Sequence, residues 1–422
     1  MKKIDIPKNY KPLDSKSLIN FIKSKKKIKE IIKDQEDFKI TEVGDGNLNL
    51  VFFADSDAIS LCIKQPLPYV RVLKDWPLTL KRSFFEYEYM KIHSDHVGNL
   101  MPQLYDYDEN LCTIAMEKLS PHIIMRQGMI KGVKYINFAE HITDYLSKTL
   151  FFTSDLYLKA SVKKKQIIIF SDNIELCKIT EDLVFTEPYM VSKRNRWTTP
   201  YLDERKVEIE NNTDLKFAVN RLKLQFLTRT ESLLHGDLHT GSIMCTPNDT
   251  KIIDPEFAFY GPMGFDIGAL LANLLINFFS QDGHAINKGE RDQYKIWILK
   301  TINSVWNDFE KKFTNLWKEN QLGDAYSSNF FNTKEESKLA IERKKFLKRV
   351  LIDSIGFAAT KIIRRIFGFA HNIDLEWIKD ENTRANCELK CSALAIKMMI
   401  NANEYNDIES LTEDAIRFDF ND

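Results

Sequence analysis

Two aspartates stand in short polar loops that follow apolar runs, where carboxylates could take part in catalysis. Asp237 lies in "LLHGDLHTGSIM", and Asp254 lies in "KIIDPEF" together with Glu256. A carboxylate that a loop holds rigidly in a cleft can orient and deprotonate a hydroxyl nucleophile, which is the role we consider for Asp237. Two hard carboxylates close together beside a phosphate would suit Mg²⁺. The alternative, ordinary loop carboxylates in solvent, stays open for either aspartate taken alone.

A glycine-containing turn and a strand lysine would supply the phosphate-binding side of such a site. The turn is "GDGNLN" at residues 44–49, where backbone N–H groups can approach a phosphate, although a plain hairpin turn explains it as well. Lys64 follows on the next expected strand, on the face opposite to the apolar residues. In kinase-type folds a lysine at this place pairs with nucleotide phosphates. Its expected ion-pair partner is Glu86 or Glu88, and the sequence does not choose between them.

The histidines near Asp237 and the six cysteines do not predict a metal centre. His235 and His239 have no third ligand at useful spacing, so we expect them to make structural hydrogen bonds. Cys387 and Cys391 are the one pair of cysteines close in sequence, and no histidine accompanies them. All six cysteines are therefore expected to be reduced thiols.

The composition is that of an ordinary globular protein without overall electrostatic bias. The chain has 422 residues, of which 44% are hydrophobic and 28% are charged, which suits two or three lobes better than one simple core. Lys+Arg and Asp+Glu balance at 60 each, so no global field favours nucleic acid. The N-terminus lacks a signal-peptide pattern, and the longest apolar stretch, "ALLANLLINFF", is too short for a bilayer. We expect a cytoplasmic enzyme without nucleic-acid or membrane partners.

Two structurally different regions would position these residues. Residues 38–70 show the pattern strand, turn, strand, turn, strand, followed by helical spacing at 80–95 and a further strand at 110–120. Helical spacing dominates after residue 120. The expected fold class is therefore α+β, with a small β-rich N-lobe, a larger mostly helical C-lobe and a ligand-binding cleft between them. The helices expected after residue 120 span residues 141–152, 214–234, 268–279 and 335–371.

Taken in order along the chain, these segments resemble the 5-methylthioribose kinase family. The resemblance is carried by "HGDLHTGSI" and "IDPEFAFYGPMGFDIG" and covers most of residues 40–372. That family belongs to the protein-kinase-like group shared with aminoglycoside phosphotransferases and choline kinases. The resemblance implies a two-lobed kinase fold and ATP-dependent phosphorylation of the 1-hydroxyl of 5-methylthioribose in methionine salvage. Further matching segments are "VGDGNLNLVF", "IKQPLPYVRV", "DWPLTL", "MEKLS", "KTLFFTSDLYL", "LVFTEPY" and "IIRRIFGFAH".

The resemblance also implies which residues hold the nucleotide and the metal. Asn49 and Lys64 would contact ATP. Asp254 and Glu256 would hold Mg²⁺ and the phosphates, with Pro255 between them in the ATP site. The backbone of the connector between the lobes would hold the adenine. The connector residues are Glu117, Lys118 and Leu119.

On the acceptor side, the resemblance implies that Asp237 binds the sugar hydroxyl and acts as catalytic base. Arg364 and Arg365 would meet methylthioribose. Trp76, in "DWPLTL", would belong to a mobile loop near the active site. Asp266, in "GFDIG", is expected to be structural and to hold the backbone of the Asp237 loop.

Helix geometry limits how the two arginines can act together. Arg364, Gly368 and His371 would share one helical face, while Arg365 points about 100° away. Both arginines can therefore reach one cleft only if the end of the helix abuts it. A solvated arginine pair is the alternative.

The change from strands to helices predicts lobes that join near Glu117–Ser120, with the N-lobe at residues 1–119 and the C-lobe at residues 120–422. The resemblance further implies a homodimer that uses ATP and Mg²⁺. Ser242 departs from the broader kinase pattern, which carries a metal-binding asparagine at this place. Glu256 is expected to supply the missing oxygen ligand from the other loop.

Two other functions stay open at this point. A kinase of the same fold could act on choline or an aminoglycoside, but such cationic ligands want an acidic pocket, which a twin arginine disfavours. A catalytically inactive binding module would be marked by the loss of Lys64, Asp237 or Asp254, and all three are present.

Overall fold

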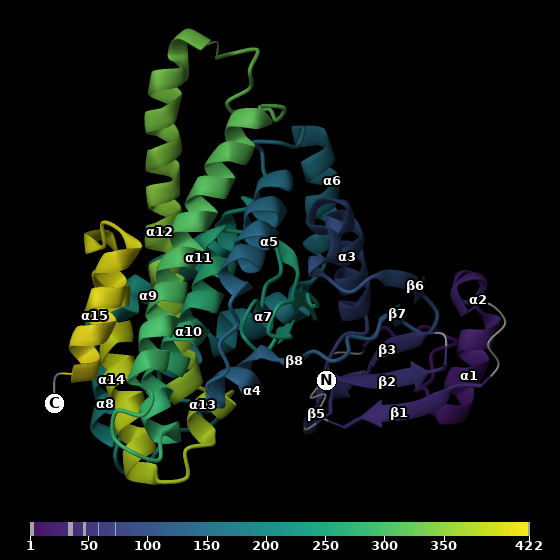
Figure 1. Ribbon diagram of the computed structural model, residues 1–422, viewed down its shortest axis with the longest axis horizontal. Coiled ribbons are helices and arrows are strands. Elements are labelled where there is room, and N and C mark those ends of the chain that lie inside the picture. Colours follow the sequence, from purple (N-terminus) through teal and green to yellow (C-terminus); the bar gives the residue numbers. More distant parts are fainter. Residues whose placement is uncertain are drawn as a thin grey trace.

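The protein consists of a strand-rich N-terminal part and a larger, mostly helical C-terminal part (Figure 1). The computed structural model describes residues 4–32, 37–44, 48–57, 59–71, 73–331 and 333–420. The strands are β1 (Lys39–Val43), β2 (Asn49–Asp55), β3 (Ser60–Pro66), β4 (Tyr69–Val70), β5 (Leu73–Pro77), β6 (Leu104–Asp108), β7 (Thr113–Glu117), β8 (Ile123–Ile124), β9 (Ser232–Leu234), β10 (Ile243–Cys245), β11 (Thr250–Ile252) and β12 (Phe259–Gly261).

Helices cover the ends and flanks of these strands and make up most of the chain after β8. The α-helices are α1 (Ser15–Ser24), α2 (Lys26–Ile32), α3 (Arg82–Val97), α4 (Met125–Ile130), α5 (Phe138–Phe152), α6 (Ala160–Phe170), α7 (Ile174–Leu183), α8 (Asp203–Asn211), α9 (Thr213–Thr228), α10 (Gly264–His284), α11 (Asp292–Glu319), α12 (Glu336–Phe367), α13 (Ile373–Glu376), α14 (Glu381–Ile400) and α15 (Ile408–Phe420). Short 3₁₀ turns occur at Gly98–Leu100, Glu187–Tyr189, Thr333–Glu335 and Ala402–Glu404.

A five-stranded antiparallel sheet in the order β1-β2-β3-β7-β6 forms the N-terminal part. Alternation along β3 sends Leu61 and Ile63 into a hydrophobic cluster with Leu18 and Ile22 of α1. Lys64 therefore projects from the opposite face, as the sequence pattern predicts. Because β3 lies between β2 and β7, the sheet holds this lysine rigidly in its centre.

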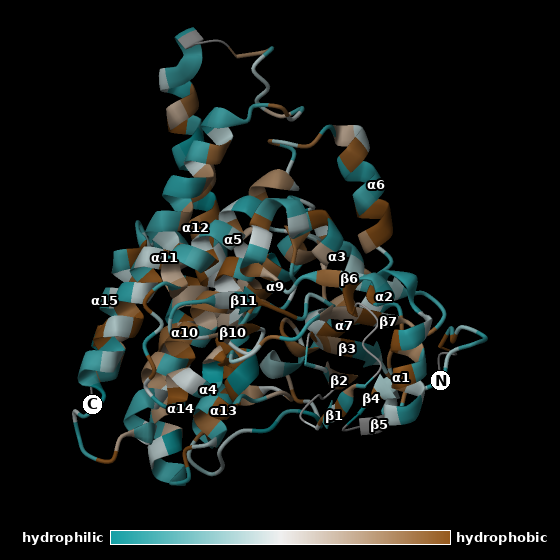
Figure 2. Ribbon diagram, turned by 45° about the vertical axis from the view of Figure 1, so that its right-hand side comes forward, coloured by the Kyte–Doolittle hydropathy of each residue, from teal (hydrophilic) through white to brown (hydrophobic). Residues whose placement is uncertain are grey.

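Helix α10 forms the centre of the C-terminal part and is buried along nearly its whole length. Helices α12 and α14 pack against it, and α11 packs on α5. In Figure 2 the outer helices α11 and α12 alternate hydrophilic and hydrophobic residues, as expected of helices with one face toward a core. Within the described ranges, no helix is both long and apolar enough to cross a membrane.

Two small antiparallel sheets frame the loops that carry the aspartates. One has the order β11-β10-β8, and the other pairs β12 with β9. The loop with Asp237 runs from β9 to β10, and the loop with Asp254 runs from β11 to β12. The two loops therefore lie next to each other where these short strands end.

The expected α+β class, with a β-rich first lobe and a helical second lobe, is confirmed. Several helix boundaries differ from the expectation, and two of these differences bear on the site. The helix expected over 214–234 ends at Thr228, and Ser232–Leu234 instead form β9, because an apolar run alone does not separate a buried strand from a helix. Helix α12 ends at Phe367, so His371 lies beyond it and does not share a helical face with Arg364.

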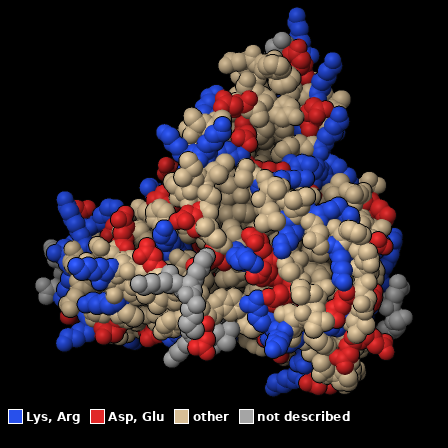
Figure 3. All heavy atoms as spheres, turned by 180° about the vertical axis from the view of Figure 1, so that it is seen from behind, with Lys and Arg blue, Asp and Glu red and all other residues tan. Residues whose placement is uncertain are grey.

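Charged side chains are mixed on the face of the molecule seen in Figure 3. Lysine and arginine alternate with aspartate and glutamate over most of that face, in line with the balance of 60 against 60. All six cysteines are free, as expected.

Candidate active site

Lys64 connects the sheet to α3 and to the helical part of the protein. Its Nζ lies 2.7 Å from Glu86 Oε2, and it also forms an ion pair with Asp254. Glu88, the rival partner, instead pairs with Lys91. Burial alone would lower the pKa of Lys64, but Asp254 and Glu86 raise it above its usual value. The lysine therefore stays charged, and its partner on α3 is Glu86.

Glu256 is tied to the N-terminal sheet by a buried polar network. Asn49 donates through Nδ2 to Glu256 Oε2 at 3.1 Å, and Arg82 Nε lies 3.3 Å from the same oxygen. Arg82 is fully buried and also donates to Asn49 Oδ1 at 3.1 Å. Its remaining N–H groups donate to the carbonyls of Leu48 and Thr79. This arginine fixes the start of β2 against the loop of the second lobe.

The carboxylates of Glu86, Asp254 and Glu256 come together into one acidic group. One oxygen of each lies within 4.8 Å of the others, and this is the one group of potential metal ligands in the described part of the chain. Partial burial works to raise the pKa of Asp254, but Lys64 lowers it below its usual value. Burial and the charge of Asp254 raise the pKa of Glu256. Among the described residues, the cations that form ion pairs with these carboxylates are Lys64 and Arg82. Hard oxygen ligands that converge in this way fit a cation such as Mg²⁺.

The two aspartate loops pack backbone against backbone. Asp254 adopts a positive φ of 69°, an uncommon conformation that functional loops often hold. Gly236 has φ 83°, and a Cβ there would lie 2.1 Å from the carbonyl oxygen of Phe257. His235 Nε2 lies 2.9 Å from the carbonyl oxygen of Ile253. The glycine and the histidine therefore set the spacing between the loops.

Asp266, at the start of α10, holds the backbone of the Asp237 loop as expected. Its carboxylate accepts hydrogen bonds from the backbone N–H groups of His235 at 2.7 Å and Gly236 at 3.0 Å. Burial raises the pKa of Asp266. The structural role expected for His235 is also confirmed.

Asp237 lies in a partly buried pocket of basic side chains. Lys361 Nζ is 3.2 Å from its Oδ1, and His239 Nε2 is 3.3 Å from its Oδ2. Burial alone would raise the pKa of Asp237, but its basic neighbours hold it well below its usual value. Burial lowers the pKa of His239 to about 4 and that of Lys361 to about 8. Near neutral pH the carboxylate is therefore ionised beside a neutral imidazole and a charged lysine.

Ser242 stabilises the Asp237 loop through hydrogen bonds within that loop. Its Oγ donates to the carbonyl oxygen of Asp237 at 3.0 Å and lies 3.2 Å from His239 Nδ1. Its own carbonyl accepts from the N–H of Ile253 at 3.0 Å. The hydroxyl thus faces its own loop, whereas Glu256 belongs to the acidic group opposite.

Arg364 and Arg365 stand in the last turn of α12, and the end of this helix abuts the site. Arg365 is 7% exposed, and its Nη1 donates to the carbonyl of Ala370 at 3.2 Å. The Nε of Arg364 is buried and has no hydrogen-bond partner among the described residues. Burial lowers the pKa of both arginines, and the charge of Asp237 opposes this shift in both. The charge of Asp237 therefore acts on both guanidinium groups, while Nη1 of Arg365 turns to the chain that follows the helix.

Three cations of the site were not singled out in the sequence. Lys361 precedes the arginine pair by three and four residues, so helical spacing would have placed it on the same side of α12. Arg82 and Arg126 reach the site from α3 and α4. No spacing in the sequence relates these two arginines to the aspartates, because only tertiary packing brings them together.

The connector starts at Glu117, the last residue of β7, and leads toward β8, apart from the charged groups of the site. The backbone N–H of Glu117 donates to the carbonyl of Gln103 at 2.8 Å. Lys118 Nζ lies 2.7 Å from Asp55, so this side chain turns back to the sheet. Leu119 is half-buried. The backbone of this segment joins the sheet to the helical part.

Residues 45–47 of the glycine-containing turn lie outside the described residues. Pro255 is buried between the two acids, and its carbonyl accepts from the N–H of Ala258 at 3.2 Å. This bond closes a turn directly after Asp254.

The β4–β5 hairpin reaches from the sheet to the end of α12. The guanidinium of Arg194 lies 4.9 Å from the ring centre of Trp76, and the ring of Phe369 lies 6.0 Å from it. Glu187 accepts hydrogen bonds from two nitrogens of Arg194, one at 3.0 Å. Thr79 N donates to a carboxylate of α7 at 2.7 Å. Trp76 therefore lies between Arg194 and Phe369, two residues beyond the end of α12.

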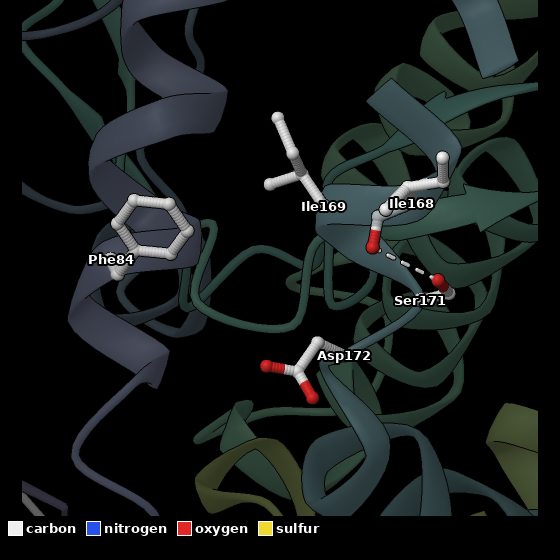
Figure 4. Close-up of a pocket in the computed structure, with 5 residues that line it drawn as sticks. All are labelled: Phe84, Ile168, Ile169, Ser171 and Asp172. Atoms are coloured by element: carbon white, nitrogen blue, oxygen red, sulfur yellow. Dashed lines mark hydrogen bonds between the residues drawn. The ribbon is translucent and has the colours of Figure 1, made fainter. Parts of the chain in front are cut away.

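Two pockets are lined by residues outside this charged site. One, of about 450 Å³, opens between α3 and α6, and Figure 4 shows Phe84 facing Ile169 and Asp172 across it. The other, of about 510 Å³, lies between β5 and α7 and includes Trp76 and Ile174. Neither is lined by the lysine, the acidic group or the arginine pair.

Comparison with known proteins gives consistent matches. Residues 166–297 match the phosphotransferase enzyme family. The chain is 46% identical over 396 residues to methylthioribose kinase 1 of Oryza sativa subsp. japonica, with 92% of each chain covered. It is 40% identical over 415 residues to methylthioribose kinase of Escherichia coli O45:K1, covering 97% of this chain and 98% of the relative. A solved glucosamine kinase in complex with glucosamine, ADP and inorganic phosphate aligns with a TM-score of 0.46 at 11% identity, covering 85% of this chain and 81% of that one.

Proposed function

Because the chain belongs to the methylthioribose kinase family, we propose that it transfers the γ-phosphoryl group of ATP to the 1-hydroxyl of 5-methylthioribose. The products would be 5-methylthioribose 1-phosphate and ADP, in methionine salvage. The observation that carries this proposal is the pairing of two opposed groups. An acidic group with Lys64 lies on one side, and ionised Asp237 within a basic pocket lies on the other.

Asp237 would bind the acceptor hydroxyl and take its proton. Its neighbours hold its pKa well below the usual value, so it is ionised at neutral pH and ready to accept. As the new O–P bond forms, the bond from the γ-phosphorus to the bridging oxygen breaks and leaves its electron pair on ADP. Phosphoryl transfer of this kind depends on positioning and on neutralising charge.

The nucleotide would lie against the N-terminal sheet. Lys64 and Asn49 would meet ATP, and the connector backbone, Glu117 to Leu119, would hold the adenine. Asp254 and Glu256 would hold Mg²⁺, because hard carboxylate oxygens with surplus negative charge converge there. Bound Mg²⁺ would neutralise charge on the phosphates. Arg364 and Arg365 would meet the acceptor side.

Three expectations stay predictions. They are the homodimer, which the family resemblance implies, and the cytoplasmic location and the division into lobes at residues 1–119 and 120–422, which follow from the sequence pattern.

A panel of acceptors tests the proposed function. ADP release would be followed with 5-methylthioribose, ribose, choline and kanamycin, each with and without Mg²⁺. We expect Mg²⁺-dependent turnover with methylthioribose and little with the cationic acceptors, because the acceptor side is basic. Turnover with choline or kanamycin but none with methylthioribose would overturn the proposal in favour of a choline or aminoglycoside kinase.

A further inference from the structure

A third arginine, outside the predicted pair, stands against the loop that carries Asp237. Arg126 is the second residue of α4, which follows β8, and β8 pairs with β10 at the end of that loop. Its backbone N–H donates to the carbonyl of Thr240 at 3.0 Å, and its Nε lies 3.2 Å from Thr240 Oγ1. The pairing of β8 with β10 and the side-chain contact with Thr240 therefore both hold Arg126 against the loop.

The guanidinium of Arg126 is held from behind by two buried polar side chains. Nη2 donates to Asn273 Oδ1 on α10 at 2.8 Å, and Nε lies 3.2 Å from Asp374 Oδ2 on α13. Asp374 is fully buried and accepts a further bond from Asn277 at 2.7 Å. A guanidinium with so many partners loses little freedom when it binds an anion.

One nitrogen of this guanidinium remains available on the side of the loop. Among the residues that the structure describes, Nη1 of Arg126 makes no hydrogen bond. A Cβ on Gly241 would lie 3.0 Å from Nη1, so the glycine lets the guanidinium lie against the loop. The side chain of Arg126 is 11% exposed, which leaves it within reach of a ligand.

The basic pocket holds more positive charge than its own carboxylates balance. The carboxylates whose charge raises the pKa of its arginines are Asp237 and Asp374. A neutral sugar would leave this surplus uncompensated, whereas a phosphate group would neutralise it. The cations of the pocket are Arg126, Lys361, Arg364 and Arg365.

We propose that Arg126, positioned by Asp374, is a ligand of the transferred phosphoryl group on the acceptor side. With the arginine pair it forms a site that also binds a free phosphate oxyanion and retains the sugar phosphate after transfer. Arg126 forms and breaks no covalent bond in this role. It donates hydrogen bonds to the oxygens of the phosphoryl group, which bring their negative charge to the acceptor side as the group is transferred. This inference rests on the proposed function and adds an anion site to it.

The test compares Arg126→Gln and Arg126→Lys with Arg417→Gln, an exposed arginine of α15, as control. Binding of orthophosphate by calorimetry, binding of ATP, and kcat with methylthioribose would be measured for each. We expect Arg126→Gln to weaken orthophosphate binding at least tenfold and to lower kcat about 100-fold, as for the loss of one oxyanion donor. Arg126→Lys should lose less, and the control should lose nothing. Unchanged ATP binding would show that the variants are folded.

A second pair of variants separates the anion site from the nucleotide side of the active site. Asp374→Asn keeps the arginine but loosens it, so it should weaken orthophosphate binding less than Arg126→Gln does. Lys64→Met should leave orthophosphate binding unchanged, because Lys64 serves the nucleotide side. Orthophosphate affinity within threefold of the wild type in Arg126→Gln would overturn the proposal. If the wild type bound orthophosphate through Arg126 but did not phosphorylate methylthioribose, the proposed function would fail while the anion site stood.

Discussion

The surroundings of Asp237 decide what this carboxylate can do. A lysine and a histidine contact its two oxygens, and its pKa is held well below the usual value. An ionised carboxylate next to a fixed lysine is a weak base in isolation, but it needs only to accept the proton as the hydroxyl attacks phosphorus. The basic pocket therefore orients the base and stabilises the phosphoryl group at once.

Replacing Asp237 tests its role as base. Asp237→Asn keeps the size of the side chain but cannot take the proton, so kcat should fall by about 10³ or more while ATP affinity stays within about twofold. Steady-state kinetics and nucleotide titration would measure both. The matched control is Asp203→Asn on α8, which should behave as wild type. Activity of Asp237→Asn within about tenfold, or roughly 1.4 kcal/mol of barrier, would exclude the role.

Lys361 should shape the pH dependence of the reaction. The base works when ionised, so kcat/KM falls as the pH drops through the pKa of Asp237. That pKa is well below its usual value in the wild type. Lys361→Met removes one cation and should move this acidic limb upward by about 1 pH unit. The wild type should also lose activity above pH 8, where Lys361 gives up its proton from a pKa of about 8, and the variant should lack that limb.

The control for Lys361→Met is Lys345→Met, which replaces an exposed lysine on the same helix. Its profile should follow the wild type. If the profile of Lys361→Met also superimposed on the wild type from pH 4 to 9, the coupling between Lys361 and Asp237 would have no role in the reaction.

At the residue scale the sequence identified the carboxylates better than the cations. The structural role of Asp266 was predictable because it stands in an ordered motif, whereas the choice of Glu86 over Glu88 as the partner of Lys64 needed the structure. Arg82 and Arg126 were not predictable, because a long side chain can reach a site from an element that nothing local connects to it. Their partners, such as Asn49 and Asp374, come from other elements.

At the scale of elements, the ends of helices and strands position the chemistry. Helix α12 ends close to Asp237, and helix α10 begins with the carboxylate that holds the loop. The sequence predicted both helices, but not the residue at which α12 ends. Gly368 caps α12, and its N–H donates to the carbonyl of Arg364 at 3.0 Å. Because glycine commonly follows the last residue of a helix, Gly368 could have predicted where α12 ends. The strand Ser232–Leu234 was missed because its partner, β12, lies later in the chain.

The β4–β5 hairpin should control acceptor binding through Trp76. Arg194→Ala removes the cation that lies over Trp76, an interaction worth about 0.5–1 kcal/mol at a partly exposed site. We expect KM for methylthioribose to rise about two- to fivefold with little change in kcat. Trp76→Ala should raise KM as well, and the double variant should add nothing further, because the two residues act together.

The control for the hairpin is Arg205→Ala, an arginine of α8 that pairs with Glu208. It should leave KM unchanged. Fully additive effects of Arg194→Ala and Trp76→Ala in the double variant would contradict a shared role.

At the scale of the whole molecule, the acidic group joins the two parts of the protein. Lys64, Asn49 and Arg82 from the first part meet Asp254 and Glu256 from the second. A cation bound between these carboxylates should therefore stabilise the complete fold. The sequence predicted the two parts and their order, but not how many side chains cross between them.

Magnesium should raise the melting temperature through this group. A ligand at 100 times its Kd stabilises the folded state by about 2.7 kcal/mol. Mg²⁺ with ATP should raise Tm of the wild type by several degrees, and Glu256→Gln should lose most of that gain. Glu413→Gln, an exposed glutamate of α15, should keep it. An equal Mg²⁺ effect in all three proteins, followed by differential scanning calorimetry, would place the metal elsewhere.

The most direct test of the central claim is ³¹P NMR of the wild-type reaction with ATP, Mg²⁺ and 5-methylthioribose. We predict one new phosphate monoester signal, coupled to the anomeric proton and equal in amount to the ADP formed. ADP without such a signal, or a phosphate on another hydroxyl, would contradict it.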